Sequence, residues 1–186
     1  MDMYKLKWTR LQAEIFRLFC VKAGQKLNLR ETARQLKVTP TAVSKALQDI
    51  EREALVKIQK SKTMNLFSIE FNRDSPRAIE LKRVENLKMI YESGLSDFLF
   101  NEFPGAAVFL FGSYSRGEDT CANEENKSDI DIAVIGSKGK HAEMAKFNAL
   151  LERDVVINYY ASLHDIHRNL KNNILSGIIL KGGVEL

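Results

Sequence analysis

The 186-residue sequence lacks long apolar runs. No stretch approaches the ~18 consecutive apolar residues of a membrane-spanning helix, and the N-terminal MDMYKLKWTR has no apolar signal-peptide core. Internal repeats and low-complexity segments are also absent. The apolar content of 45% and the charged content of 28% are ordinary for globular proteins. We therefore expect a globular protein with no membrane partner.

Cysteine is scarce as well. Cys20 falls in an apolar helical pattern, and Cys121 falls in a polar loop. Two such residues give no evidence of a disulfide framework, so a reduced, cytoplasmic setting is the default expectation.

The net charge of +4 conceals an asymmetry between the two halves. Residues 1–92 hold 19 Lys and Arg against 11 Asp and Glu, a balance of +8, whereas residues 93–186 hold 9 against 13, a balance of −4. A basic half joined to an acidic half indicates two domains with different partners, although charge can also scatter unevenly by chance.

Three helices are predicted in the basic half. Residues 9–23 place apolar side chains at helical spacing. A second, short helix is expected to about residue 36, because Asn28 followed by Glu31 resembles a capping box. Residues 39–53 begin with Thr-Pro, a favourable N-cap followed by proline at the first helical position.

Two strand-like runs, VKIQK and LFSIEF, follow these helices and flank a polar tip. Residues 8–72 thus resemble the winged helix-turn-helix domain of bacterial and archaeal transcription regulators. In that family the third helix lies in the major groove of DNA and the wing contacts phosphates or the minor groove. The resemblance implies that double-stranded DNA is contacted by Thr41, Ser44, Lys45 and Gln48 on the helix and by Lys60 and Lys62 at the wing. Such domains also serve as protein-interaction modules, but the basic balance favours DNA.

A cluster of turn-forming residues, NRDSP, separates this domain from the remainder. We expect a DNA-binding domain at residues 1–72, a connecting helix at 73–94 and a second domain at 95–186. The connecting helix could pack on either domain or on a second subunit, in a homodimer.

The second domain contains the segment AVFLFGSYSRGEDTCANEENKSDIDIAVIG, in which a buried strand ends at Gly112-Ser113. In the next predicted strand, alternation places Asp129 and Asp131 on one face. Two adjacent carboxylates repel each other unless a cation lies between them, and hard oxygen ligands of this kind suit Mg²⁺ together with substrate phosphates. Gly-Ser at a strand end lets backbone N–H groups and a hydroxyl approach a phosphate, and the expected helix after it favours an anion.

This arrangement resembles the nucleotidyltransferase superfamily that includes DNA polymerase beta, and FGSYSRG is most similar to its minimal bacterial and archaeal members. The resemblance implies that Gly112 and Ser113 hold the phosphates of a nucleoside triphosphate, with Arg116 as a further phosphate contact. It also implies that Asp129 and Asp131 are catalytic and bind Mg²⁺ or Mn²⁺. The segment between Ser113 and Asp129 is longer than in minimal members, which a polar surface insertion around DTCANEEN explains.

A complete site of this family needs a third acidic residue on a later strand, to help activate the attacking hydroxyl. In the strand DVVINYY the family pattern falls most naturally on Asn158, and asparagine is a poorer metal ligand than aspartate. Asp154 is the nearby carboxylate, four residues earlier on the same face and close to the strand start. Asp154 is therefore the candidate third catalytic residue, and the sequence leaves the choice open.

The sequence thus predicts an α+β protein of two domains, a winged helix-turn-helix followed by a mixed α/β nucleotidyltransferase-like domain. The family resemblance implies transfer of a nucleoside monophosphate from a triphosphate to an acceptor hydroxyl. Minimal members often modify a HEPN-type ribonuclease toxin, so a protein acceptor is one hypothesis. The alternative is a transcription regulator whose second domain binds nucleotide without catalysis.

Overall fold

The computed structural model describes residues 8–60, 67–123, 126–137, 139 and 142–183. The chain divides into two compact units, of which the first contains residues 1–82 and 120–126 and the second contains residues 83–119 and 127–186. The division falls inside one helix, α4 (Pro76–Glu92). Within the described residues, no helix has both the length and the apolar character that crossing a bilayer requires.

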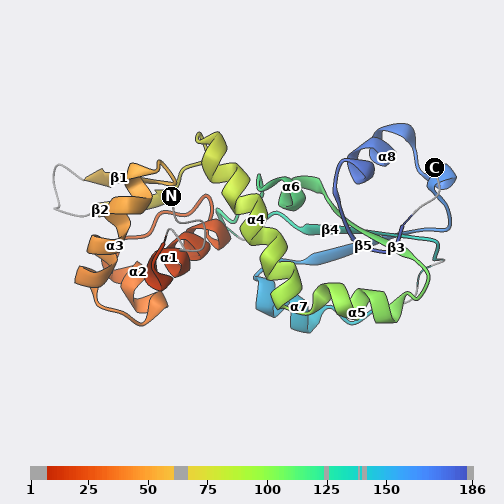
Figure 1. Cartoon of the computed structure of the whole chain (residues 1–186), viewed down its shortest axis with the longest axis horizontal. Coiled ribbons are helices and arrows are strands. Elements are labelled where there is room, and N and C mark those ends of the chain that lie inside the picture. The colour runs from red at the N-terminus through yellow and green to blue at the C-terminus, as the bar shows by residue number, and fades with distance from the viewer. Residues whose placement is uncertain (1–7, 61–66, 124–125, 138, 140–141, 184–186) are drawn as a thin grey trace, which may run out of the picture. The chain divides into compact units, whose positions relative to one another are not determined.

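The first unit has the predicted order of three helices and a hairpin (Figure 1). Helix α1 (Arg10–Val21) is followed by α2 (Leu29–Leu36), and the expected capping box between Asn28 and Glu31 is formed. Helix α3 (Pro40–Arg52) begins at the Thr39 N-cap, whose hydroxyl accepts a hydrogen bond from the Ala42 N–H. Strands β1 (Val56–Lys60) and β2 (Phe67–Phe71) pair antiparallel, with Val56 opposite Phe71.

One apolar core holds this unit together. It contains five almost completely buried side chains from three elements: Ile15 and Phe19 of α1, Val43 and Leu47 of α3, and Ile69 of β2. Each is at an inward position of its helix or strand, which is why one stripe of every element is apolar. The fold is that of a winged helix-turn-helix domain, as the sequence predicted.

Residues 120–126 also belong to the first unit. The Cys121 N–H donates to the carbonyl of Ala23 at 2.7 Å, and Gln25 Nε2 donates to the carbonyl of Cys121 at 2.6 Å. The expected insertion is therefore polar in composition, but Cys121 itself is buried, because the loop bonds to the segment that follows α1.

The second unit is built on a four-stranded sheet. Its strands are β3 (Ala107–Phe111), β4 (Ile130–Ile135), β5 (Val155–Tyr160) and β6 (Ile178–Lys181), in the order β5-β4-β3-β6. Strands β4 and β5 are parallel, and β3 is antiparallel to both of its neighbours. Mixed pairing of this kind fits the predicted α+β class.

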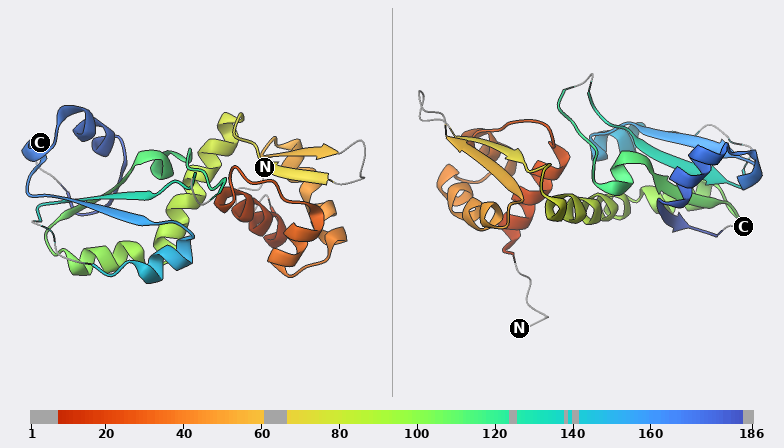
Figure 2. Two further views of the ribbon diagram at one scale, coloured as in Figure 1. Left: turned by 180° about the vertical axis from the view of Figure 1, so that it is seen from behind. Right: turned by 90° about the horizontal axis from the view of Figure 1, so that it is seen from above.

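Helices cover both faces of this sheet (Figures 1 and 2). On one face, Val108, Ile132 and their neighbours pack with α5 (Leu95–Glu102), α7 (Ala145–Leu151) and the C-terminal half of α4. On the other face, Phe109 and Ala133 pack with α8 (Arg168–Leu175) and with the single turn of 3-10 helix at Leu163–Asp165. Asp131 belongs to this second face, because alternate residues of a strand share a side.

Candidate functional site

The Gly-Ser turn lies directly after β3, where the one-turn helix α6 (Gly112–Arg116) begins. Gly112 has a φ of +74°, in the left-handed region that favours glycine. A Cβ atom at this position would lie 2.2 Å from Oδ2 of Asp131. Because Gly112 has no side chain, the backbone of the turn contacts the Asp131 carboxylate. Two of the predicted site residues, Gly112 and Asp131, therefore lie together.

Asp131 is the second residue of β4 and is half-buried, whereas Asp129 precedes the strand and is exposed. Burial raises the pKa of the Asp131 carboxyl, and the negative charge of Asp129 raises this pKa further. The Arg116 guanidinium acts in the opposite direction and lowers the pKa. The structure thus brings Asp129, Asp131 and Arg116 close enough for their charges to interact.

Arg116 also has neighbours of its own. Its Nε donates to the Glu118 carboxylate at 2.7 Å, and its Nη1 donates to Oδ1 of Asn173 on α8 at 3.2 Å. The side chain is about half exposed, at 47%, so the guanidinium is accessible to a ligand. Arg116 is held beside the aspartates rather than extended away from them.

The register of β5 places the candidate third residue. Asp131 lies opposite Val156, Ala133 lies opposite Asn158, and the Ile130 N–H donates to the carbonyl of Asp154 at 2.8 Å. Asp154 is therefore level with Asp129, at the start of the strand, and Asn158 is one step beyond Asp131. The residue directly beside Asp131 is therefore the apolar Val156, which is 39% exposed.

The side chains of Asp154 and Asn158 have other partners in the structure. The Asp154 carboxylate accepts a hydrogen bond from Asn148 Nδ2 at 3.3 Å and lies 3.8 Å from Lys127 Nζ. Asn158 Nδ2 makes a long contact of 3.5 Å with the carbonyl of Ile132. Among the described residues, no group of three or more His, Cys, Asp or Glu side chains is arranged to hold a metal.

A buried polar network behind the turn was not predicted from the sequence. Asn86 Nδ2 donates to the carbonyl of Tyr114 at 2.9 Å and to Oδ1 of Asp119 at 2.7 Å. Arg153 Nη2 donates to Oδ2 of Asp119 at 3.2 Å, and both of these side chains are 1% exposed. The network joins α4, the end of the Gly-Ser turn and the segment before β5. It therefore holds the turn in place from its buried side. No local signal could have identified it, because Asp119 and Arg153 lie in segments that are polar in sequence.

In the first unit, the four predicted DNA-contacting residues of α3 are all exposed: Thr41, Ser44, Lys45 and Gln48. They lie on the side of the helix opposite Val43 and Ile50, which are completely buried. Lys60 is the last residue of β1, and Lys62 lies outside the described residues. The helix thus presents hydroxyl, amide and ammonium groups together.

The fold and these residues define a two-domain protein, in which a winged helix-turn-helix unit is followed by a nucleotidyltransferase-type unit. Residues 95–184 match the family model described as polymerase beta, nucleotidyltransferase. The match agrees with the nucleotidyltransferase-like domain that the Gly-Ser and Asp-x-Asp pattern predicted.

Several solved bacterial proteins are similar to part of the chain. Adhesin competence repressor from Streptococcus pyogenes is 18% identical over 52% of this chain and 69% of its own, with a TM-score of 0.40. A mutant of ZitR from Lactococcus lactis is 23% identical over 55% and 67%, with a TM-score of 0.39. MepR from S. aureus, solved as a DNA complex, is 17% identical over 51% and 77%, with a TM-score of 0.37. No curated protein matches the sequence.

Proposed function

We propose that the protein binds double-stranded DNA through its first unit and a nucleoside triphosphate with a divalent cation through its second. The proposal of nucleotide binding rests on the contact between the Gly112 backbone and the Asp131 carboxylate. A phosphate bound to the Gly-Ser turn would lie beside the carboxylates that share its cation. This adjacency is the arrangement that triphosphate binding requires.

The donor set suits Mg²⁺ or Mn²⁺. Asp129 and Asp131 supply hard oxygen ligands, and Mg²⁺ in proteins usually takes one or two carboxylates together with phosphate oxygens and water. The raised pKa of Asp131 indicates that its charge is unfavourable in the free protein. A cation between the two carboxylates would offset that cost.

Phosphate binding is assigned to the turn and to Arg116. Five residues make α6 too short for a helix dipole to contribute much, so the backbone N–H groups of the turn and the Ser113 hydroxyl are the proposed donors. The accessible Arg116 guanidinium can add charge-assisted hydrogen bonds to the phosphate chain.

Nucleotidyl transfer is the second candidate function, and the position of Asp154 level with Asp129 favours it. In this reaction an acceptor hydroxyl would attack the α-phosphate, pyrophosphate would leave, and a carboxylate would take up the hydroxyl proton. Val156 beside Asp131 cannot do this, so the geometry supports nucleotide binding better than fast transfer. If transfer occurs, a hydroxyl on a HEPN-type toxin is the acceptor that the family resemblance implies.

The DNA half rests on the exposed face of α3 and on the charge of +8 over residues 1–92. Short hydroxyls and an amide can bond to base edges, and Lys45 can contact phosphate. Regulation of transcription, a cytoplasmic location and a homodimer stay predictions.

Titration calorimetry tests the nucleotide half. We expect wild-type protein to bind a triphosphate only when Mg²⁺ or Mn²⁺ is present, and the double variant Asp129→Asn, Asp131→Asn to lose this metal-dependent binding while keeping its circular dichroism spectrum. Asp97→Asn, on α5 at the opposite face of the sheet, is the matched control and should bind like wild type. Unchanged metal-dependent binding in the double variant would refute the site.

A further inference from the structure

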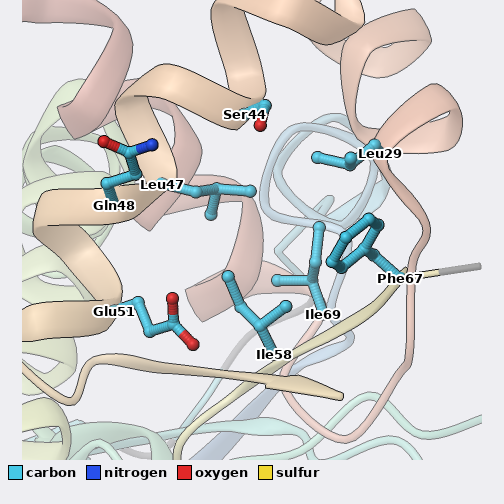
Figure 3. A pocket seen from close by; sticks show the side chains of 8 residues that line it. All are labelled: Leu29, Ser44, Leu47, Gln48, Glu51, Ile58, Phe67 and Ile69. Carbon is cyan, nitrogen blue, oxygen red and sulfur yellow. The ribbon is translucent and has the colours of Figure 1, made fainter. Parts of the chain in front are cut away.

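A second candidate binding site lies in the first unit, between α3 and the hairpin (Figure 3). The cavity has a volume of about 260 Å³ and is distinct from the Gly-Ser site. Four structural elements line it: the start of α2, one side of α3 and the strands β1 and β2. We call it the α3 pocket, and it is lined by Leu29, Ser44, Leu47, Gln48, Glu51, Ile58, Phe67 and Ile69.

The walls of the α3 pocket are apolar. Leu47 extends from α3 toward Ile69 and Phe67 on the other side, and the ring of Phe67 stands beside Leu29 (Figure 3). Leu47 and Ile69 are buried, but Phe67 is 37% exposed and is reachable from solvent. Such a surface suits a flat apolar group that can stack on the phenylalanine ring.

The rim of the α3 pocket is polar and comes from a single helix face. Ser44, Gln48 and Glu51 are spaced at i, i+4 and i+7, so they follow one another along α3. Within the described part of the chain, none of these three side chains takes part in a hydrogen bond or an ion pair. Their polar groups are therefore available to a ligand.

The negative charge of the Glu51 carboxylate indicates that the ligand is a cation. A carboxylate on the exposed side of α3 repels DNA phosphates, so it does not serve the DNA contacts proposed for its helix neighbours Ser44 and Gln48. Its carboxylate instead lies beside Ile58 at the edge of the apolar cavity (Figure 3). A carboxylate beside an apolar wall is complementary to an organic cation with an apolar body.

We propose that the α3 pocket binds a small aromatic amine, whose ring packs against Phe67 and Leu47 and whose ammonium group pairs with Glu51. Gln48 and Ser44 supply further hydrogen bonds at the rim. Pockets that bind small molecules combine apolar walls with a few placed polar groups in this way.

Occupation of the α3 pocket weakens DNA binding. Ser44 and Gln48 line the pocket and are also proposed to contact base edges, so ligand and duplex compete for the same two side chains. This competition rests on the proposed DNA-binding function, whereas ligand binding itself does not.

Calorimetry with tryptamine as the probe tests the binding step on the full chain. We expect tryptamine to bind more tightly than its neutral analogue tryptophol, and indole-3-acetate, which is an anion, to bind most weakly. Glu51→Gln should lower the affinity for tryptamine about fivefold, the effect of losing a partly exposed ion pair, and should leave tryptophol unaffected. Phe67→Ala should weaken both ligands, and Glu80→Gln on α4 is the control that should change neither.

Several results would overturn the proposal: no binding of tryptamine, equal binding of tryptamine and indole-3-acetate, or full affinity in Glu51→Gln. A mobility-shift assay then tests competition, which predicts release of duplex DNA by tryptamine in wild type and less release in Glu51→Gln. If the wild-type protein retards no DNA, the DNA-binding function fails while calorimetry still decides the pocket. If tryptamine binds but DNA stays bound, the competition is refuted.

Discussion

At the residue scale, Gly112 determines the geometry of the proposed nucleotide site. Its left-handed backbone and the close approach of Asp131 Oδ2 both exclude a side chain. The sequence allowed the Gly-Ser turn and the aspartates to be assigned to one site, because each lies at the end of an apolar strand. The steric contact between Gly112 and Asp131 depends on strand pairing, so it could not be predicted.

Replacing Gly112 should damage both the fold and the site. Gly112→Ala places a Cβ atom against the Asp131 carboxylate and also strains the backbone, at a cost of about 1–2 kcal/mol for the strain alone. Gly105→Ala is a matched control, because Gly105 has a φ of +81° but nothing lies within 4 Å of the place a Cβ atom would take. We expect chemical denaturation to show a larger loss of stability for Gly112→Ala, and calorimetry to show loss of nucleotide binding only there. Equal losses in the two variants would mean that the contact with Asp131 is unimportant.

The raised pKa of Asp131 predicts how stability depends on pH. The folded protein holds this proton more tightly than the unfolded chain, so the contribution of Asp131 to stability is greatest below the ordinary aspartate pKa of about 3.9 and is lost as pH rises through the folded pKa. Asp131→Asn removes the unfavourable charge. In metal-free urea denaturation the variant should therefore be more stable than wild type at pH 7, with no such gain at pH 3.5. A variant less stable than wild type at pH 7 would contradict the assigned burial and repulsion.

At the element scale, the predicted helices and strands of the first unit closely follow the observed ones, because caps and apolar periodicity are local signals. The register of β5 could not be predicted in the same way, because it depends on pairing with β4. The sequence offered Asn158 or Asp154 as the third residue, whereas pairing puts Val156 beside Asp131. The buried Asp119–Arg153 pair was likewise beyond prediction, because burial of a charge depends on tertiary contacts.

The observed register predicts how a third carboxylate can be supplied. Paired residues of adjacent parallel strands share a face about 4.8 Å apart, so Val156→Asp would place a carboxylate beside Asp131. We expect this variant to transfer labelled nucleotide to an acceptor faster than wild type, as a third carboxylate would help to activate the hydroxyl. Asn158→Asp, one step further along β5, should increase transfer less.

Asp154→Asn provides the opposing test. If Asp154 already acts as the third carboxylate, wild-type protein should transfer nucleotide and Asp154→Asn should abolish that activity. Robust wild-type transfer that survives Asp154→Asn would contradict the assignment of Asp154 as the third carboxylate. It would also contradict the expectation that transfer is slow without a third carboxylate on β5.

At the scale of the whole molecule, the charge asymmetry matches the division into two units with different proposed ligands. Binding of duplex DNA should weaken steeply with salt, as neutralised phosphates release their counterions. Lys45→Ala should weaken binding to all DNA sequences alike, whereas Gln48→Ala should change the base preference at one position by about 1–3 kcal/mol. Lys171→Ala on α8, in the second unit, serves as the control in mobility-shift assays. Failure of the wild-type protein to retard any fragment at low salt would favour a protein-interaction module instead.

We propose that the Gly-Ser turn and the two aspartates form one metal-dependent triphosphate site. A crystal structure of the protein with Mn²⁺ and a non-hydrolysable triphosphate tests it most directly, because the anomalous signal of manganese locates the ion unambiguously. We expect a manganese peak between the carboxylates of Asp129 and Asp131, with phosphate oxygens on the backbone of Gly112 and Ser113. A bound triphosphate elsewhere, or a manganese peak away from both aspartates, would contradict it.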